Sequence, residues 1–365
     1  MDLDLSDDQE LFRETTRKFL AARWPTSAVR GLLDDALGFD RDLWARGAEL
    51  GWTSMLIPEE HDGGSISGAG VKDLAVVVEE LGRALTPGPT IPTNVVAAGI
   101  ATGGADHLAK EHLPGIATGQ VVATWTSPVA PVDGEATDGG LRLTGVAVPV
   151  QDAAVADLLL VTARTADGAV LALVPSDTKG LVIERLESLD LTRRYARVRF
   201  EGVEVPATSL LPQADVDHLF ALALALQCAE TVGAASATFD FTLQYVKDRK
   251  AFGRPIGSFQ ALKHRLAEHT LWLETARAVT SNAVAAVQAG SDGLDAARLA
   301  KVWVAERCPA LVRDCLQMHG GIGFTWEHDL HLFLRRIDAN AAIHGGAGHQ
   351  LDALASTIGL PGAPA

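Results

Sequence analysis

Two segments in the C-terminal half of the chain combine residue types that bind phosphate groups and nucleotides. The first, YVKDRKAFGRPIGSFQALKH from Tyr245 to His264, places Arg249 and Arg254 at a Gly/Pro corner between two predicted helices. Arginine side chains and the positive end of a helix dipole both attract anions, so this corner is a candidate site for a diphosphate. The local pattern also allows a solvated basic helix junction that binds nothing.

The second segment, QMHGGIGFTWEH from Gln317 to His328, contains a Gly-Gly-x-Gly run. Glycine lets a backbone approach a ligand closely. The run does not follow a predicted strand, so it is not a Rossmann fingerprint, and a helix end with a tight turn is the alternative. His328 and His331 have helical spacing, but no third or fourth ligand is evident near them, so we predict no metal site.

Charge is unevenly distributed along the 365 residues. The chain carries a formal net charge of −15, whereas the stretch from Lys247 to Arg336 contains 13 Lys and Arg against 9 Asp and Glu. A surface that binds nucleic acid or an anionic membrane needs a basic face, so the acidic balance argues against both partners. If the protein binds a phosphorylated ligand, we expect the ligand at this less acidic stretch.

The sequence also favours a reducing compartment. Its three cysteines, Cys228, Cys308 and Cys315, form no CxxC motif. The acidic N-terminus lacks the basic region of a signal peptide. The most apolar run, Leu219 to Cys228, is shorter than the ~20 residues that span a bilayer. We therefore expect a soluble, cytoplasmic protein.

The periodicity of the chain, which must position both segments, changes twice. Helical patterns over residues 1–117 predict an N-terminal helical domain, and short β-type runs over 118–210 predict a small barrel or sandwich. Long helical patterns return over 211–365 and predict a C-terminal helical domain. Its main helices are expected near 217–250, 259–289 and 294–319, and the strands near 121–125, 141–145, 158–162, 170–174 and 195–200.

In this order, the two segments and the α–β–α organisation resemble the acyl-CoA dehydrogenase family over nearly the whole chain. The Arg-x-x-Phe-Gly motif at Arg249 and the Gln-x-x-Gly-Gly-x-Gly motif at Gln317 are the most specific matches, and both match without gaps. The resemblance implies an α+β multidomain fold with an N-terminal helical domain, a middle β-barrel and a C-terminal four-helix bundle. It also implies assembly as a tetramer.

The resemblance further implies an FAD cofactor bound between subunits. The family oxidises an acyl-CoA thioester to the enoyl-CoA: a base removes the α proton, a hydride leaves the β carbon for the flavin, and an electron-transfer flavoprotein accepts the electrons. Six residues match the family's contacts to the diphosphate and adenosine of a neighbouring subunit's FAD, namely Arg249, Phe252, Gln260, Gln317, Gly320 and Gly321.

Neither position at which the family places its catalytic glutamate holds a carboxylate. The commoner position, 24 residues after Gly320, holds His344, and the alternative position, on the long predicted helix, holds Ala223. The next residue, usually an arginine that helps to bind substrate, is Leu224. His344 is either a substitute base or a residue that fills vacated space. Glu230, on the same helix face as Ala223, is a further candidate base, with a packing hydrogen bond as the alternative.

The expected flavin-ring contacts are changed as well. Thr124-Trp-Thr-Ser-Pro stands where the family has Thr-Glu followed by Gly-Ser, and Pro149 and Gln151 replace a tryptophan and a hydroxyl beside the ring. Some bacterial members of the family pair two unlike subunits, one of which lacks the base. The resemblance therefore predicts such a non-base subunit, with a partner subunit that carries the glutamate. A self-sufficient dehydrogenase or flavin monooxygenase that uses His344 is the alternative, and a flavin-free structural subunit is another.

Overall fold

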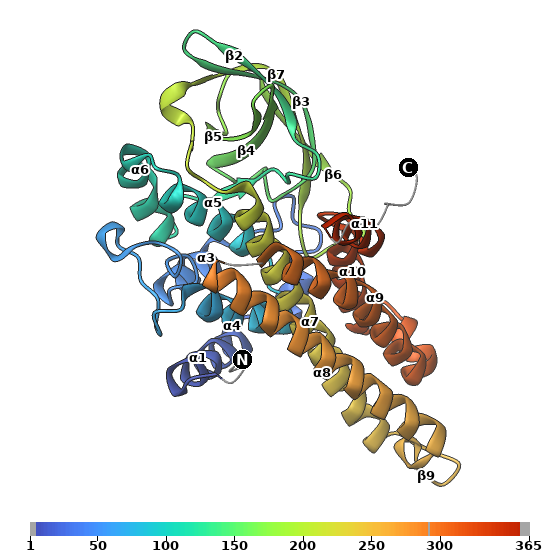
Figure 1. Ribbon diagram of the computed structural model, residues 1–365. Coiled ribbons are helices and arrows are strands. Elements are labelled where there is room, and N and C mark those ends of the chain that lie inside the picture. The colour runs from blue at the N-terminus through green and yellow to red at the C-terminus, as the bar shows by residue number, and fades with distance from the viewer. Residues whose placement is uncertain (1–4, 291–292, 358–365) are drawn as a thin grey trace.

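The computed structural model describes residues 5–290 and 293–357, which form three successive parts (Figure 1). Helices come first, a β-sheet follows, and long helices end the chain, as the sequence predicts. The first part contains α1 (Asp7–Arg23), α2 (Thr26–Gly31), α3 (Arg41–Glu49), η1 (Glu59–His61), α4 (Gly70–Arg83), α5 (Thr90–Thr102) and α6 (Asp106–Ala117).

Local sequence signals explain where several of these helices begin. At the start of α1, the Ser6 hydroxyl accepts from the Gln9 backbone N–H, and the Gln9 side chain accepts from the Ser6 backbone N–H, which together form a capping box. At α3, the Asp40 carboxylate accepts from the Leu43 backbone N–H at 2.9 Å. These caps satisfy backbone donors that the helices themselves leave free.

The middle part is one seven-stranded sheet around its own apolar core. Its strands are β1 (Ala123–Trp125), β2 (Val132–Thr137), β3 (Gly140–Gln151), β4 (Leu158–Thr165), β5 (Gly168–Pro175), β6 (Leu181–Leu186) and β7 (Tyr195–Pro206). Their order is β1-β4-β2-β3-β7-β6, with β5 paired to β4. Inward side chains such as Leu143, Leu159 and Phe200 fill the core. Among the described residues no ladder joins β5 to β6, so the predicted barrel is a sheet with two edges.

The third part is built around α7 (Val216–Asp248), a 33-residue helix that packs against α4, α8 (Gln260–Ala289) and α9 (Gly293–His319). It continues through η4 (Gly320–Phe324), α10 (Leu330–Ala342) and α11 (Ala347–Thr357). The hairpin of α7 and α8 projects away from the sheet and ends at β8 (Lys250–Ala251), β9 (Arg254–Pro255) and η3 (Ile256–Ser258) (Figure 1).

The length of α7 corrects the expectation that the chain has no apolar segment long enough to span a bilayer. The apolar run at Leu219 to Cys228 belongs to this much longer helix, which is long and apolar enough to cross a membrane. Its most apolar window is wholly buried inside the protein. Packing of a core helix therefore accounts for its composition.

Two glycines let α4 and α7 cross at close range. A Cβ atom at Gly82 would lie 2.0 Å from the Glu230 carbonyl oxygen, and one at Gly233 would lie 1.9 Å from the Glu79 carbonyl oxygen. Neither carbonyl belongs to a flexible side chain, so only glycine fits at both positions. This close crossing sets the position of Glu230, on α7, relative to α4 and the other N-terminal helices.

Candidate functional site

The corner between α7 and α8 presents Arg249 at the far end of the helical hairpin. Arg249 caps the C-terminus of α7, where its N–H donates to Tyr245 and its carbonyl accepts from Ile256, both at 2.8 Å. Phe252 and Gly253 form the turn between β8 and β9 with φ values of 53° and 80°. A bulky residue is rarely held at positive φ, and Phe252 is also 94% exposed. Such a strained, exposed ring is typical of a position that contacts another molecule.

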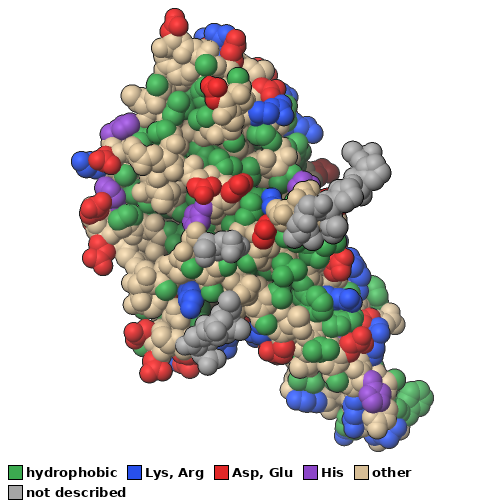
Figure 2. Space-filling model, in the orientation of Figure 1, with side chains coloured by type: hydrophobic (Ala, Val, Ile, Leu, Met, Phe, Trp, Pro, Cys, Tyr) green, Lys and Arg blue, Asp and Glu red, His purple; other side chains and the backbone are tan. Residues whose placement is uncertain are grey.

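Four cations gather at this tip. Lys247, Arg249, Lys250 and Arg254 are all exposed, and none of them pairs with a carboxylate in the described part of the chain. Figure 2 shows basic side chains at the same end of the molecule. The N-terminus of α8, which begins at Gln260, has no side-chain cap, so its first N–H groups are free to meet an anion.

The structure brings the glycine segment to the same end of the helical domain. The Tyr245 hydroxyl donates to the His319 carbonyl at 3.3 Å, which ties the start of η4 to the last turn of α7. Gln317 is exposed, and Gly320 has a φ of 64°. A Cβ atom at Gly320 or Gly321 would meet nothing within 4 Å, so the backbone there faces open space.

The donors at this end of the molecule fit the diphosphate and adenosine portion of FAD. Arginine and lysine side chains and free helix N–H groups suit a diphosphate, and an exposed phenyl ring beside open glycine backbone suits a planar base. Arg249, Phe252 and Arg254 are all exposed on this chain.

His344 lies in the loop between α10 and α11, where it is half-buried. Its Nδ1 atom is 3.1 Å from the Ser127 hydroxyl, and its ring lies 5.3 Å from that of Trp125 and 6.3 Å from that of Phe220. Desolvation by these neighbours, helped by the charge of Lys301, lowers the pKa of His344 to about 3. The imidazole is therefore neutral at pH 7.

This environment favours a packing role for His344 over a role as the base. A general base works best when its pKa lies near the operating pH, and a pKa of about 3 makes His344 a weak proton acceptor. Its ring lies among the aromatic side chains that line this position. Ala223 and Leu224, at the alternative base position, are both 0% exposed and belong to the apolar core.

Glu230 is held in a buried ionic network and is not free to act as a base. Its carboxylate accepts from Arg193 at 2.9 Å, from Arg336 at 3.1 Å and from the Asn340 amide at 2.7 Å. Burial alone would raise the pKa of Glu230, but the two arginines and these hydrogen bonds lower it to about 2. Arg336 continues the network to Asp190, at 2.6 Å. The carboxylate is thus a permanent counter-ion.

The hydroxyl groups near the expected flavin-ring position are engaged within the chain. The Thr124 hydroxyl donates to the Gln151 carbonyl at 2.6 Å, and the Thr126 hydroxyl accepts from the Thr162 N–H at 2.9 Å. The Gln151 amide donates to the Gly88 carbonyl at 3.2 Å. The Thr124 and Thr126 side chains are buried, so the structure does not present them to a ligand.

Several polar residues of this region were not singled out from the sequence. Ser127 contacts His344, and Asp152, whose pKa burial raises to about 6, has one carboxylate oxygen without a partner. Lys301 is 2% exposed and donates to the Gln227 amide oxygen and, at very short range, to the Asn340 carbonyl. Charged residues inside apolar helical stretches, as at Lys301, are the one sequence signal that could have revealed the network.

His328 and His331 contact aromatic and backbone groups. The rings of His328 and Phe241 lie 5.5 Å apart, and His331 Nε2 is 3.1 Å from the Trp326 carbonyl. Within residues 5–290 and 293–357, no group of three or more His, Cys, Asp or Glu side chains is close enough to hold a metal ion.

Comparison with known proteins gives consistent matches along the chain. Residues 6–120 match the acyl-CoA dehydrogenase N-terminal domain, and residues 218–359 match the acyl-CoA dehydrogenase C-terminal domain. The acyl-CoA dehydrogenase IpdE2 of Mycolicibacterium smegmatis is 34% identical over 97% of this chain and 100% of that protein.

Two solved structures share the fold. A variant of the Tcur3481-Tcur3483 steroid ACAD has a TM-score of 0.90 at 29% identity, covering 96% of this chain and 98% of that chain. The ChsE4-ChsE5 complex from Mycobacterium tuberculosis has a TM-score of 0.91 at 26% identity, covering 100% of both chains.

Proposed function

The chain belongs to the acyl-CoA dehydrogenase family, and we propose that it acts there as the subunit that lacks the base and completes the FAD site of an unlike partner. One observation carries this proposal. The tip of the α7–α8 hairpin keeps exposed donors that fit the diphosphate of a neighbour's FAD, while His344 and Ala223 occupy the two base positions. A self-sufficient enzyme would need both the diphosphate donors and a catalytic base in one chain.

In this proposal the complex converts an acyl-CoA thioester to the enoyl-CoA, with an electron-transfer flavoprotein as electron acceptor. FAD supplies the hydride acceptor when it is bound. The residues of this chain would bind and orient the FAD. Arg249 and the free N–H groups of α8 would contact the diphosphate, and Phe252 with the backbone at Gly320 and Gly321 would contact the adenosine. The α proton is removed by the partner's glutamate.

The relatives support a heteromeric assembly and suggest which substrates to test first. Both solved structures described above are named for two components, and one of them is named a steroid ACAD. We therefore propose a bulky, ring-bearing acyl-CoA as the first substrate class to assay. All three cysteines are free and buried, which fits the proposed cytoplasmic location.

The proposal is tested by co-expressing the chain with an acyl-CoA dehydrogenase encoded beside it and assaying acyl-CoA oxidation by the purified complex. Replacing the partner's catalytic glutamate with glutamine is expected to abolish turnover. His344→Ala in this chain is expected to change the turnover number less than threefold, because the imidazole is too weak a base to be used.

The opposite pattern would overturn the proposal. If His344→Ala abolished turnover while the partner's glutamate variant kept it, this chain would supply the base and would be a self-sufficient enzyme. If neither the chain nor any complex that contains it held flavin, the flavin-free structural function would replace the proposed one.

A further inference from the structure

Three histidines border the glycine segment, and the function proposed above uses none of them. His319 ends α9, directly before η4, and His328 and His331 lie beside the start of α10. Between them, η4 is a 3-10 helix of five residues. Such helices have poorer hydrogen-bond geometry than α-helices, so the place of η4 depends on the side chains packed around it.

His319 fastens the start of η4 to α7. Its ring is 3% exposed and stacks with the rings of Tyr245, at 4.2 Å, and Phe241, at 5.9 Å. The Nδ1 atom is 2.9 Å from the Cys315 carbonyl oxygen, which can only accept, so Nδ1 carries the proton of the neutral ring. The Nε2 atom is buried and has no hydrogen-bond partner among the described residues. A second proton would therefore create a buried charge with an unpaired donor.

His328 and His331 are also arranged for the neutral form. The N–H of Leu330, the first residue of α10, donates to His328 Nδ1 at 3.4 Å, so this nitrogen carries no proton. His331 Nε2 donates to the Trp326 carbonyl at 3.1 Å, whereas its buried Nδ1 has no partner among the described residues. The His331 ring also stacks on that of Trp326 at 4.9 Å. A second proton on either ring would meet no acceptor.

The three rings also lie close to other groups that oppose a positive charge. The ring centres of His319 and His328 are 5.0 Å apart. Burial lowers the pKa of all three histidines. The charge of Arg30, on α2, adds to this effect at His328 and His331. Geometry and charge therefore favour the same neutral state.

The carboxylate that acts on these rings already has a partner. Asp329 favours the charged form of two of them, but its Oδ1 atom accepts from Arg30 at 2.7 Å. Arg335, on α10, acts in the opposite direction. The ionisable neighbours on α7 and α9 are Tyr245 and Cys315, which carry no charge near pH 7.

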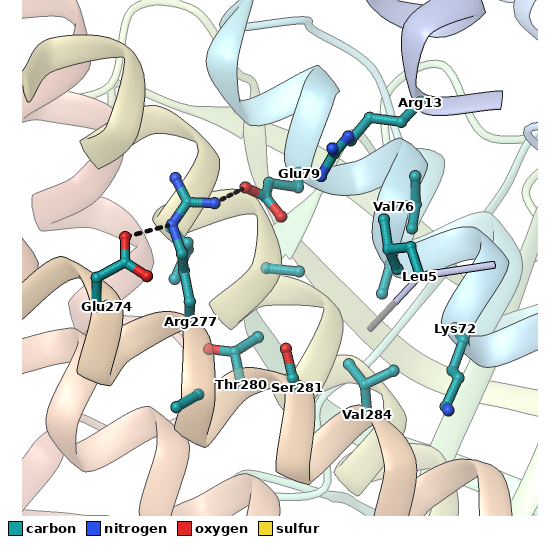
Figure 3. A pocket seen from close by; sticks show the side chains of 14 residues that line it. Leu5, Arg13, Lys72, Val76, Glu79, Glu274, Arg277, Thr280, Ser281 and Val284 are labelled. Carbon is teal, nitrogen blue, oxygen red and sulfur yellow. Dashed lines mark hydrogen bonds and ion pairs between the residues drawn. The ribbon is translucent and has the colours of Figure 1, made fainter. Parts of the chain in front are cut away.

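Elsewhere, long helices are joined by charged pairs. Figure 3 shows Arg277, on α8, beside Glu79, on α4, and beside Glu274, at distances of 2.9 Å and 3.5 Å. A guanidinium keeps its charge throughout the range of pH that proteins meet. Histidine is instead the side chain that ordinarily changes its charge between pH 5 and 8. The glycine segment is therefore fastened by groups that mild acid can charge.

We propose that His319, His328 and His331 form a clasp, the histidine clasp, that holds the glycine segment against α7 near neutral pH and releases it on acidification. An unfolded histidine titrates near 6.5, and the folded values are lower, so the stabilisation is fully present above about pH 6.5 and is lost as the pH falls below it. Under the proposed function, the FAD affinity of the complex should fall over the same range. The clasp itself lies within this chain, so either proposal can fail alone.

Hydrogen–deuterium exchange of the full-length chain at pD 7.5, 6.5 and 5.5 tests the histidine clasp without flavin. The readout is the protection factor, which removes the change in intrinsic exchange rate with pD. Protection of residues 320–328 is expected to fall at least about tenfold between pD 7.5 and 5.5, because each desolvated histidine can contribute up to about tenfold per pH unit. Residues 300–312, within α9, are expected to stay protected throughout, which shows that the chain is still folded.

A double variant ties the loss to the histidines. His319→Phe keeps a ring in the stack, and His328→Gln keeps an acceptor for the Leu330 N–H, so together they remove two titrating groups and preserve the contacts. The protection of 320–328 in this variant is expected to fall less than about threefold over the same range. His264→Gln replaces an exposed histidine on α8 and should follow the wild type. His328→Gln alone, expected to give an intermediate loss, serves if the double variant does not fold.

Three results would overturn the proposal. The wild-type segment could keep its protection at pD 5.5, or the histidine variants could lose protection as steeply as the wild type. Loss of protection of 300–312 at the same pD would show that the whole chain opens and that no local clasp is released.

Discussion

His344 occupies the position where a proton acceptor would be expected, but its surroundings make it a poor one. The sequence identifies which residue occupies this position, because spacing from the glycine segment is enough to find it. It does not reveal that Ser127 and Trp125 lie against the ring, because those contacts join segments more than 200 residues apart. The low pKa of His344 follows from these contacts and could be derived only from the structure.

The depressed pKa of His344 predicts a specific pH dependence of stability. The folded value is about 3, whereas an unfolded histidine titrates near 6.5, so below pH 6.5 the unfolded chain takes up a proton that the folded chain refuses. The contribution of His344 to the free energy of unfolding is therefore fully present above pH 6.5 and is lost as the pH falls toward 3. The loss is at most about 1.4 kcal/mol per pH unit.

Urea unfolding of the wild-type chain and of His344→Gln at pH 7, 6 and 5 measures this effect. The wild type is expected to lose more stability than the variant as the pH falls. Parallel pH profiles for the two proteins would show that the imidazole is not desolvated in the folded state.

Arg249 should contribute directly to flavin affinity. Arg249→Ala removes a planar charged donor from the tip, and charged hydrogen bonds of this kind contribute about 1.5–3 kcal/mol, which corresponds to a loss of FAD affinity of roughly 10- to 150-fold. Lys247→Ala removes one positive charge from the same exposed tip and serves as the control. Fluorescence titration of the deflavinated complex with FAD measures both. Equal losses in the two variants would mean that only the overall charge of the tip matters.

At the scale of elements, the long helices could be predicted from the sequence, and two strands of the seven-stranded sheet could not. The helices near 217–250, 259–289 and 294–319 agree with α7, α8 and α9 to within about two residues, because long apolar periodicity is a strong signal. Strands β2 and β6 were missed. Strand β2 contains Asp, Gly and Glu, which disfavour strands, and it forms because β3 and β4 pair with it on either side.

The crossing of α4 and α7 predicts a large difference between two glycine substitutions. Gly82→Ala would place a methyl group 2.0 Å from a backbone carbonyl, so the helices must move apart, at a cost of about 1–3 kcal/mol. Gly31→Ala, at the end of α2, meets nothing within 4 Å and should leave stability nearly unchanged. Thermal unfolding of both variants measures the difference, and similar melting temperatures would show that the helices do not pack this closely.

The buried network that joins α7, α10 and the loop before β7 predicts a stability defect, not a catalytic one. Glu230→Gln leaves Arg193 and Arg336 without their shared counter-ion, which costs about 3–5 kcal/mol for a buried pair. Glu14→Gln breaks an exposed pair with Lys18 and should produce no measurable loss. If Glu230→Gln instead abolished turnover of the complex and left stability unchanged, Glu230 would be the base.

On the scale of the whole molecule, the charge asymmetry along the sequence becomes an asymmetry in space. The basic residues between Lys247 and Arg254 lie at the tip of a projecting hairpin, while His344 and the altered flavin-ring region lie in the body, near the sheet (Figure 1). Under the proposed function, in which the tip serves a neighbour and the body holds no flavin ring, each pair of unlike subunits should give one complete site. The reciprocal site, formed by the partner's tip and this chain's body, should stay empty.

The ratio of flavin to protein shows directly whether this chain holds FAD alone or only together with an unlike partner. FAD is released from purified protein by denaturation and quantified against chain concentration, for this chain expressed alone and for its complex with the partner. We expect no retained FAD for the lone chain and one FAD for each pair of unlike chains in the complex. A yellow oligomer of this chain alone that holds one FAD per chain would contradict it.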